Sequence, residues 1–244
     1  MMLFIGMILF VAAVVQGLIG FAMAIVAIPL LVWTGLPLSE AIAVSMASTM
    51  VQALTGMFKL RHAIPWEIVR LSLVVRSLSL PIGILIMVQL DGIETSEVKA
   101  VLGSCIILIV LVKISLKIEP KEKLAAKWNY FAFACSGLFA GMVGMGGPPL
   151  VLWVAAHQWN GDKIKAFLFA NFAILSPVGL LMIWMALGPN ILRAAGKGFL
   201  FAPLVILGSL LGVWLGTFVP RERLRMILYI MLIVMGIASI VMAR

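Results

Sequence analysis

The segment GMVGMGGPPLVLW, residues 141–153, places helix-breaking residues inside a strongly apolar stretch. In a helix interior Gly costs about 1 kcal/mol and Pro about 3 kcal/mol, and a backbone group left unpaired in lipid is costly as well. Irregular backbone at membrane depth is tolerated where protein buries it or where it lines a wet cavity. We therefore expect a loop that exposes backbone N–H groups, followed by a short helix that begins at Pro148 and Pro149. The start of such a helix favours an anion.

Close helix packing is the alternative explanation for glycines in apolar runs, because small residues four apart let two helices approach each other. The pairs Gly137/Gly141 and Gly212/Gly216 fit this explanation. The segment 144–149 fits it poorly, since packing does not require two adjacent prolines.

Polar side chains within apolar runs supply further candidates. Arg76 lies in LSLVVRSLSLPIG, where a charge at membrane depth indicates function, although snorkelling to the inner surface is an equal alternative. Gln16 can cap a helix or touch a ligand. A lone Ser or Thr in a membrane helix usually satisfies its hydroxyl by a hydrogen bond to its own backbone, which the larger Asn171 amide does less easily. The predicted substrate-binding residues are Gln16, Gly17, Gly20, Phe21, Ser45, Ser48, Gln52, Arg76, Gly144, Gly146, Gly147, Pro148 and Asn171.

Catalytic groups are missing from the apolar runs. All nine acidic residues fall in loops or at span ends, and the two histidines, His62 and His157, lie in a loop and near a span end. Intramembrane hydrolysis would need a nucleophile and a base at depth, so we predict no catalytic residue, no metal site, no cofactor and no enzymatic activity. The absence of a buried carboxylate favours facilitated or exchange transport over a carboxylate-based proton mechanism.

The composition predicts an all-α polytopic membrane protein. Of 244 residues, 64% are apolar and 11% charged, and the mean hydropathy is +1.22, which excludes a soluble fold. The net charge of +9 comes from cations in short loops, where the positive-inside rule places them. No basic face or aromatic-interleaved patch suggests nucleic-acid binding.

The chain is expected to form one transmembrane domain, residues 1–244, made of two similar halves. GLIG at 17–20 matches GMVG at 141–144, and IPLLVW at 28–33 matches PPLVLW at 148–153. The charged linker 113–127 separates repeat 1, about residues 1–118, from repeat 2, about residues 128–244. Such weak internal symmetry is typical of duplicated transporters.

The first apolar run of each half is too long for one straight span. Residues 1–33 as a helix would measure about 50 Å, whereas the hydrocarbon core is about 30 Å thick. Two interpretations remain: one broken span, or a re-entrant hairpin of two short arms. In the hairpin topology 13 of the 18 Lys and Arg lie on the inner side of the membrane and four on the outer side. With eight crossings the loops on the two sides hold 11 and six of them. We therefore favour two broken hairpins plus about six full crossings, with the second half inverted, over eight segments.

The order of these features resembles the sulfite exporter TauE/SafE family, also called the toluene-sulfonate uptake permease family. The features are a Gly-rich apolar run, the loop leading into SEAIAVSMAS, the basic loop KLRHAIPW, the charged linker and GMVGMGGPPLVLW. The resemblance covers almost the whole chain. It implies transport of sulfite, sulfonates, sulfoacetate or related organic anions across a bacterial or archaeal inner membrane. The first-half element, GLIGFAMAIVAIP, carries less glycine than is usual, which makes that wall more apolar and suits an organic tail.

We accordingly predict a secondary transporter that works by alternating access, with the anion held mostly by backbone amides at the two broken elements. An anion channel and a membrane helper subunit without transport of its own are the alternatives. The expected partners are a small anionic substrate and the lipid bilayer, without nucleic acid, and a homodimer is left open.

Overall fold

The computed structural model describes residues 2–92, 94–115 and 124–216, together with residues 218, 230, 233–234, 237–238 and 240–241. In this part of the chain the named elements are all helical. They are α1 (Met2–Ile19), α2 (Met23–Trp33), α3 (Leu38–Lys59), the short 3₁₀ helix η1 (Arg61–Ala63), α4 (Trp66–Asp91), α5 (Thr95–Ser115), α6 (Ala126–Val143), α7 (Gly147–Ala155), α8 (Gly161–Leu187), α9 (Asn190–Leu200) and α10 (Ala202–Leu215). The middle of the linker and most of the last predicted run, 224–243, lie outside the described residues.

Three of these helices, α3, α4 and α8, are long and apolar enough to cross a membrane, and α9 with α10, bent by 51°, forms a fourth candidate among the described residues. Along α4 the exposed side chains Val74, Leu78, Ile82 and Leu85 form one apolar stripe. An exposed stripe of this kind suits contact with lipid rather than water. The prediction of an all-helical membrane fold is confirmed, while the number of crossings stays a prediction.

Both predicted glycine breaks are present. α1 ends at Ile19 and α2 begins at Met23, with Gly20 between them at φ +99°. α6 ends at Val143 and α7 begins at Gly147, with Gly144 at φ +72°. Positive φ is a conformation that glycine adopts without a Cβ penalty, so the backbone at each break favours glycine at this position.

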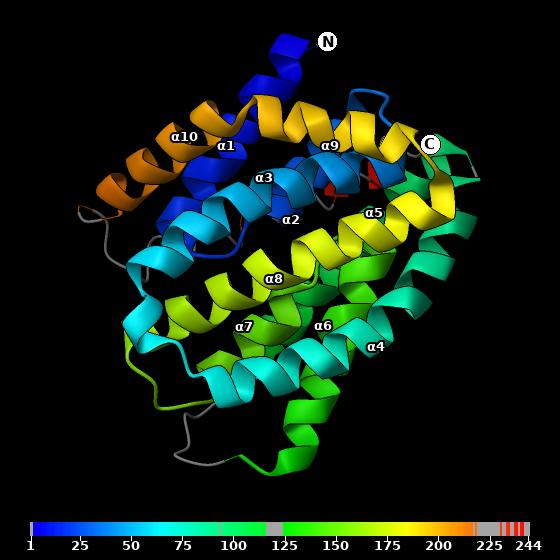
Figure 1. Cartoon of the computed structure of the whole chain (residues 1–244). Helices are drawn as coiled ribbons and strands as arrows, with labels where there is room; N and C mark the ends of the chain where they lie inside the picture. Colours follow the sequence, from blue (N-terminus) through cyan, green and yellow to red (C-terminus); the bar gives the residue numbers. More distant parts are fainter. Residues whose placement is uncertain are drawn as a thin grey trace.

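Two groups of helices, one containing α3 and the other containing α8, pack against each other where α3 contacts α8 (Figure 1). α1, α9 and α10 lie beside α3, whereas α4 and α7 lie beside α8 and α6 packs along α4. The groups do not follow the order of the chain, because α4 from before the linker packs along α6, and α10 from after it packs along α1. Each group therefore contains helices from both halves of the sequence.

Glycines bring these exchanged helices close together. A Cβ at Gly83 of α4 would lie 2.9 Å from the Gly141 Cα of α6, and a Cβ at Gly17 of α1 would lie 3.1 Å from the Gly212 Cα of α10. The first distance is too short for a real side chain, and a Cβ at Gly17 would also clash with the Ser209 carbonyl oxygen of α10. The packing explanation therefore describes Gly137, Gly141 and Gly212, and it extends to Gly17, which the sequence placed in the binding site. Around Gly216, by contrast, a Cβ would have no contact closer than 3.3 Å.

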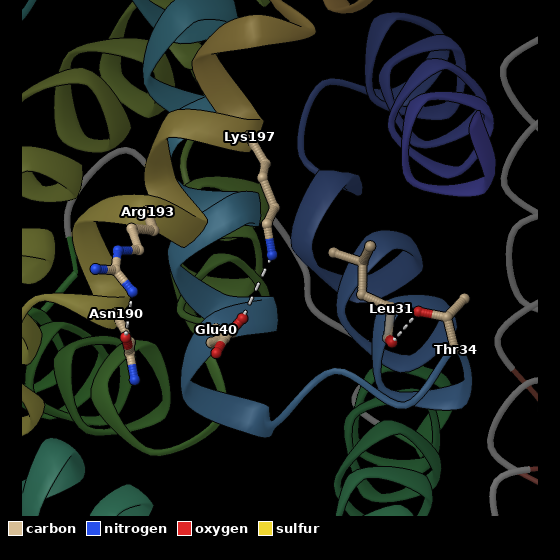
Figure 2. Close-up of polar contacts among 6 residues, drawn as sticks. All are labelled: Leu31, Thr34, Glu40, Asn190, Arg193 and Lys197. Carbon is tan, nitrogen blue, oxygen red and sulfur yellow. Dashed lines mark hydrogen bonds and ion pairs between the residues drawn. The ribbon is translucent and has the colours of Figure 1, made fainter. Parts of the chain in front are cut away.

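One ion pair joins α9 to the first turn of α3 (Figure 2). The Lys197 ammonium of α9 lies 3.6 Å from a carboxylate oxygen of Glu40, in the first turn of α3. Arg193, one turn earlier on α9, contacts the Asn190 side chain at 3.5 Å. Both members of the ion pair are about one quarter exposed, so water and salt screen their attraction.

The Glu40→Gln variant should lose less than about 1 kcal/mol of unfolding free energy, because partly exposed ion pairs contribute little. The difference from the unsubstituted protein should shrink as salt is added. Thermal unfolding in detergent at low and high ionic strength measures both effects. A loss of several kcal/mol would mean that this contact anchors α9 on α3.

Candidate functional site

One cavity lies where the two broken elements meet. The α1–α2 break and the α6–α7 break each line it, and α3, α4 and α8 complete its wall. The volume open to the centre of a water molecule is about 50 Å³, and one water needs about 10–15 Å³ on this measure. The space therefore suits an ion of a few heavy atoms. The predicted site residues that line it are Gln16, Phe21, Ser45, Arg76, Gly144, Gly146 and Gly147.

Arg76 is the charged side chain at this cavity. It is 1% exposed, so it does not snorkel to the surface and the alternative of a surface-reaching side chain is wrong. Its guanidinium carbon lies 5.9 Å from the centre of the Phe172 ring, a cation–π arrangement. Its Nη1 donates to Asn171 Oδ1 at 3.2 Å, whereas its Nε has no partner. Among the described residues no carboxylate forms an ion pair with it.

Asn171 accepts a hydrogen bond from Arg76 and lies outside the residues that line the cavity. Its Oδ1 accepts from Ser72 Oγ at 2.8 Å as well as from Arg76, and its Nδ2 donates to the Phe167 carbonyl at 3.0 Å. The amide is fully buried and does not line the cavity. Asn171 is thus a positioning residue for Arg76, and because its oxygen is neutral it leaves the charge of the guanidinium uncompensated.

Gln16 takes the first of the two roles that its sequence position left open, the helix cap, and its other polar atom stays available for the second. Its Oε1 accepts from the Met23 backbone N–H at 2.8 Å and so caps the first turn of α2. Its Nε2 is buried without a partner, and the residue lines the cavity. The side chain therefore satisfies a helix end with one atom and leaves a donor for a ligand with the other.

Ser45 on α3 adds a third unsatisfied group. Its hydroxyl is buried without a partner and belongs to a residue that lines the cavity. Together with Gln16 Nε2 and Arg76 Nε it makes three buried groups that can each donate a hydrogen bond. Unsatisfied buried polar groups are rare in folded proteins, so three around one cavity indicate a ligand that accepts hydrogen bonds.

Some backbone N–H groups at the two breaks are not available to a ligand. The Met23 N–H at the start of α2 already donates to Gln16, and Pro148 and Pro149 in the first turn of α7 have no N–H to offer. Gly147, the first residue of α7, lines the cavity and keeps its N–H. Side-chain donors therefore stand beside backbone N–H groups at the cavity, and recognition by backbone amides stays a prediction.

The remaining predicted residues lie outside the cavity lining. Ser48 donates to the Val44 carbonyl at 3.0 Å and contacts the Gly198 carbonyl of α9 at 3.5 Å. Gln52 Nε2 donates to Ser209 Oγ of α10 at 2.7 Å. Gly17 packs against α10, Gly20 forms the turn between α1 and α2, and Pro148 is buried in the first turn of α7.

Thr49, Phe172 and Ser176 are among the lining residues that were not predicted from the sequence. Thr49 lies four residues after the predicted residue Ser45 on α3, at helical spacing, and was within reach of the sequence pattern. Ser176 precedes Pro177 in α8 and donates to the Phe172 carbonyl at 2.7 Å, a local contact typical of a membrane helix. Phe172 shows no feature that separates it from the other phenylalanines of the chain.

Comparison with protein families gives a match to the family described as Sulfite exporter TauE/SafE over residues 5–239. The chain belongs to this family. The TauE/SafE match confirms the resemblance and identifies a multi-pass membrane protein of a family that exports sulfite or related anions. Comparisons with curated proteins and with solved structures gave no match.

Neighbouring glycines in this TauE/SafE protein should respond to alanine in opposite ways. A Cβ at Gly147 would meet Phe21 O at 3.4 Å and Phe172 Cζ at 3.6 Å, ordinary contact distances, so Gly147→Ala should fold and weaken anion binding about 3- to 10-fold by filling the cavity. At Gly146 a Cβ would lie 2.6 Å from Ser136 O and 2.7 Å from Ala140 Cβ, so Gly146→Ala should lose about 1–3 kcal/mol of stability.

Anion titration and thermal unfolding of both purified variants measure these effects. Equal stability of the two variants would contradict the geometry at Gly146. Unchanged anion affinity in Gly147→Ala would show that the ligand does not reach α7.

Proposed function

We propose that the protein is a secondary transporter that carries a small anion across a bacterial or archaeal inner membrane by alternating access, with the anion bound in the cavity between the two breaks. Sulfite, a sulfonate, sulfoacetate and related organic anions are the candidate substrates. The observation that carries the proposal is Arg76, which is buried beside the cavity without an acidic partner in the described part of the chain.

The energetic argument rests on the cost of a buried charge. An isolated ion inside protein or lipid loses its hydration and is strongly destabilised unless it is paired. Asn171 and the Phe172 ring supply neutral contacts to Arg76, which reduce this cost without cancelling the charge. An anion in the cavity would cancel the charge and accept hydrogen bonds from Gln16, Ser45 and Arg76.

Alternating access in this proposal uses the two halves, about residues 1–118 and 128–244, as inverted repeats. Its support comes from reciprocal packing: α4 lies along α6 as α10 lies along α1, each through glycines, and α3 contacts α8 between them. Each half also begins with a helix pair broken at a glycine of positive φ. Paired broken helices at a repeat interface are a common position for a transported ion.

Uptake of radiolabelled sulfite and methanesulfonate into proteoliposomes tests the proposal. Uptake should be saturable, should persist in Gly196→Leu, where a Cβ would meet no atom within 4 Å, and should fall to background in Gly147→Leu, which fills the cavity. Both variants must remain monodisperse. Uptake that survives Gly147→Leu would remove the cavity as the site.

The same preparation separates the alternative functions. Single-channel currents with uptake that does not saturate would identify an anion channel. Complete absence of anion flux and of anion binding would support a helper subunit without transport of its own. Exchange of labelled for unlabelled anion across the membrane would support the transporter.

A further inference from the structure

We infer that the cavity accepts an anion carrying a single negative charge, such as a monosulfonate or hydrogen sulfite. It discriminates against anions carrying two, which removes doubly charged sulfoacetate from the candidate substrates. This inference rests on the proposed function, because it concerns the ligand of the same site. Its basis is the charge inventory of the cavity wall, which contains one full positive charge.

The inventory begins with the side chains. Arg76 is the only Lys, Arg, His, Asp or Glu among the residues described as lining the cavity. The unpaired donors Gln16 Nε2 and Ser45 Oγ are neutral, and so are the other lining donors, the Thr49 and Ser176 hydroxyls and the Gly147 N–H. Asn171, which holds the guanidinium from behind, is neutral as well. One monovalent anion therefore brings the side-chain charge of the occupied site to zero.

The helix ends do not add a second positive charge. The start of α2 and the start of α7 each contribute a partial positive charge at the breaks. The C-terminal ends of α1 and α6 lie at the same two breaks and contribute partial negative charges of similar size. Because a broken helix brings both kinds of end to one place, their contributions largely offset each other, and Arg76 determines the sign and the size of the charge.

The apolar part of the wall makes an uncompensated charge expensive. Phe21, Ile25, Met46, Phe172 and Leu175 line the same cavity, and such groups cannot solvate an ion. A dianion would leave one negative charge unpaired among them, and an unpaired charge in a site of low polarity is strongly disfavoured. The neutral donors can orient either kind of anion, so they do not distinguish between the two.

Methanesulfonate and sulfate provide the test, since both are small and tetrahedral and they carry one and two charges at neutral pH. We expect purified protein in detergent, titrated by calorimetry at constant ionic strength, to bind methanesulfonate about 30-fold or more tightly than sulfate. Nitrate and thiosulfate, with one and two charges, should repeat the preference. Equal or tighter binding of sulfate and thiosulfate would overturn the inference while leaving anion transport intact. Failure of all four anions to bind would overturn the proposed function with it.

Two substitutions at Gln16 show whether charge is the cause. Gln16→Glu keeps a side-chain oxygen that can cap the Met23 N–H, and its carboxylate brings a negative charge to the cavity wall. Gln16→Ala removes the cap and the donor and adds no charge. If charge governs binding, the Glu variant should lose about 30-fold or more in methanesulfonate affinity and the Ala variant clearly less. An Ala variant that binds as weakly as the Glu variant would assign the selectivity to hydrogen-bond geometry and overturn the inference.

Discussion

Replacement of Arg76 by Gln should weaken anion binding at least about 30-fold and, at the same time, raise the thermal stability of the anion-free protein. Removing one member of a buried, hydrogen-bonded charge pair costs roughly 2–5 kcal/mol of binding free energy, which is about 30-fold to several thousand-fold in affinity. The empty protein, in contrast, loses a buried charge that no carboxylate of the described residues neutralises, and removal of an unpaired charge stabilises a fold.

The two expected effects have opposite signs, and this separates a binding role from a structural one. Thermal unfolding in detergent with and without methanesulfonate measures both, because a ligand that binds the folded state raises the melting temperature. Arg76→Lys, which keeps the charge and loses the planar fork that Asn171 engages, should retain part of the anion effect. Lower stability of anion-free Arg76→Gln, with the anion effect preserved, would assign Arg76 to the fold and not to the site.

Replacement of Gly141 by Leu should prevent the protein from folding into its native arrangement. A Cβ at this position would clash with the Leu80 carbonyl and lie 2.8 Å from the Ile84 backbone nitrogen, both on α4. Backbone atoms of a helix cannot move aside as the end of a flexible side chain can. Separation of α4 from α6 would expose their glycine surfaces, and the loss should exceed about 4 kcal/mol, the range reached by severe core substitutions.

Gly196→Leu is the matched control, since it introduces the same side chain into a helix at a position where nothing lies within 4 Å. Size-exclusion chromatography in detergent should show a monodisperse Gly196→Leu variant and an aggregated or absent Gly141→Leu variant. Native-like yield and anion binding in Gly141→Leu would mean that α4 and α6 can separate without loss of the site.

Local chemistry made the breaks predictable from the sequence. Glycines in apolar runs, with adjacent prolines in the second half, indicated interrupted helices, and the structure has Gly20 and Gly144 at positive φ at the turning points. The all-helical class followed from composition alone. These features depend on neighbouring residues, so the sequence contains the information needed to predict them.

The composition of the site depends on contacts between distant segments, which the sequence does not display. Arg76 and Asn171 are 95 positions apart, and their hydrogen bond needs α4 and α8 to meet. Gly17 and Gly20 occur in the same GLIG motif, yet one packs against α10 and the other forms a turn. The cap that Gln16 places on Met23 likewise removed a backbone amide that the motif had seemed to offer.

The exchange of helices between the two halves has a consequence for synthesis of the chain. α4 leaves the ribosome before its partner α6 has been made. α1 likewise leaves it long before its partner α10, the last of the named helices. Until then the glycine surface of α4 lacks its partner, and Arg76 lacks the Asn171 oxygen that holds it. We therefore expect that neither half folds alone, so that two fragments divided at the linker are each degraded when produced alone and accumulate when produced together.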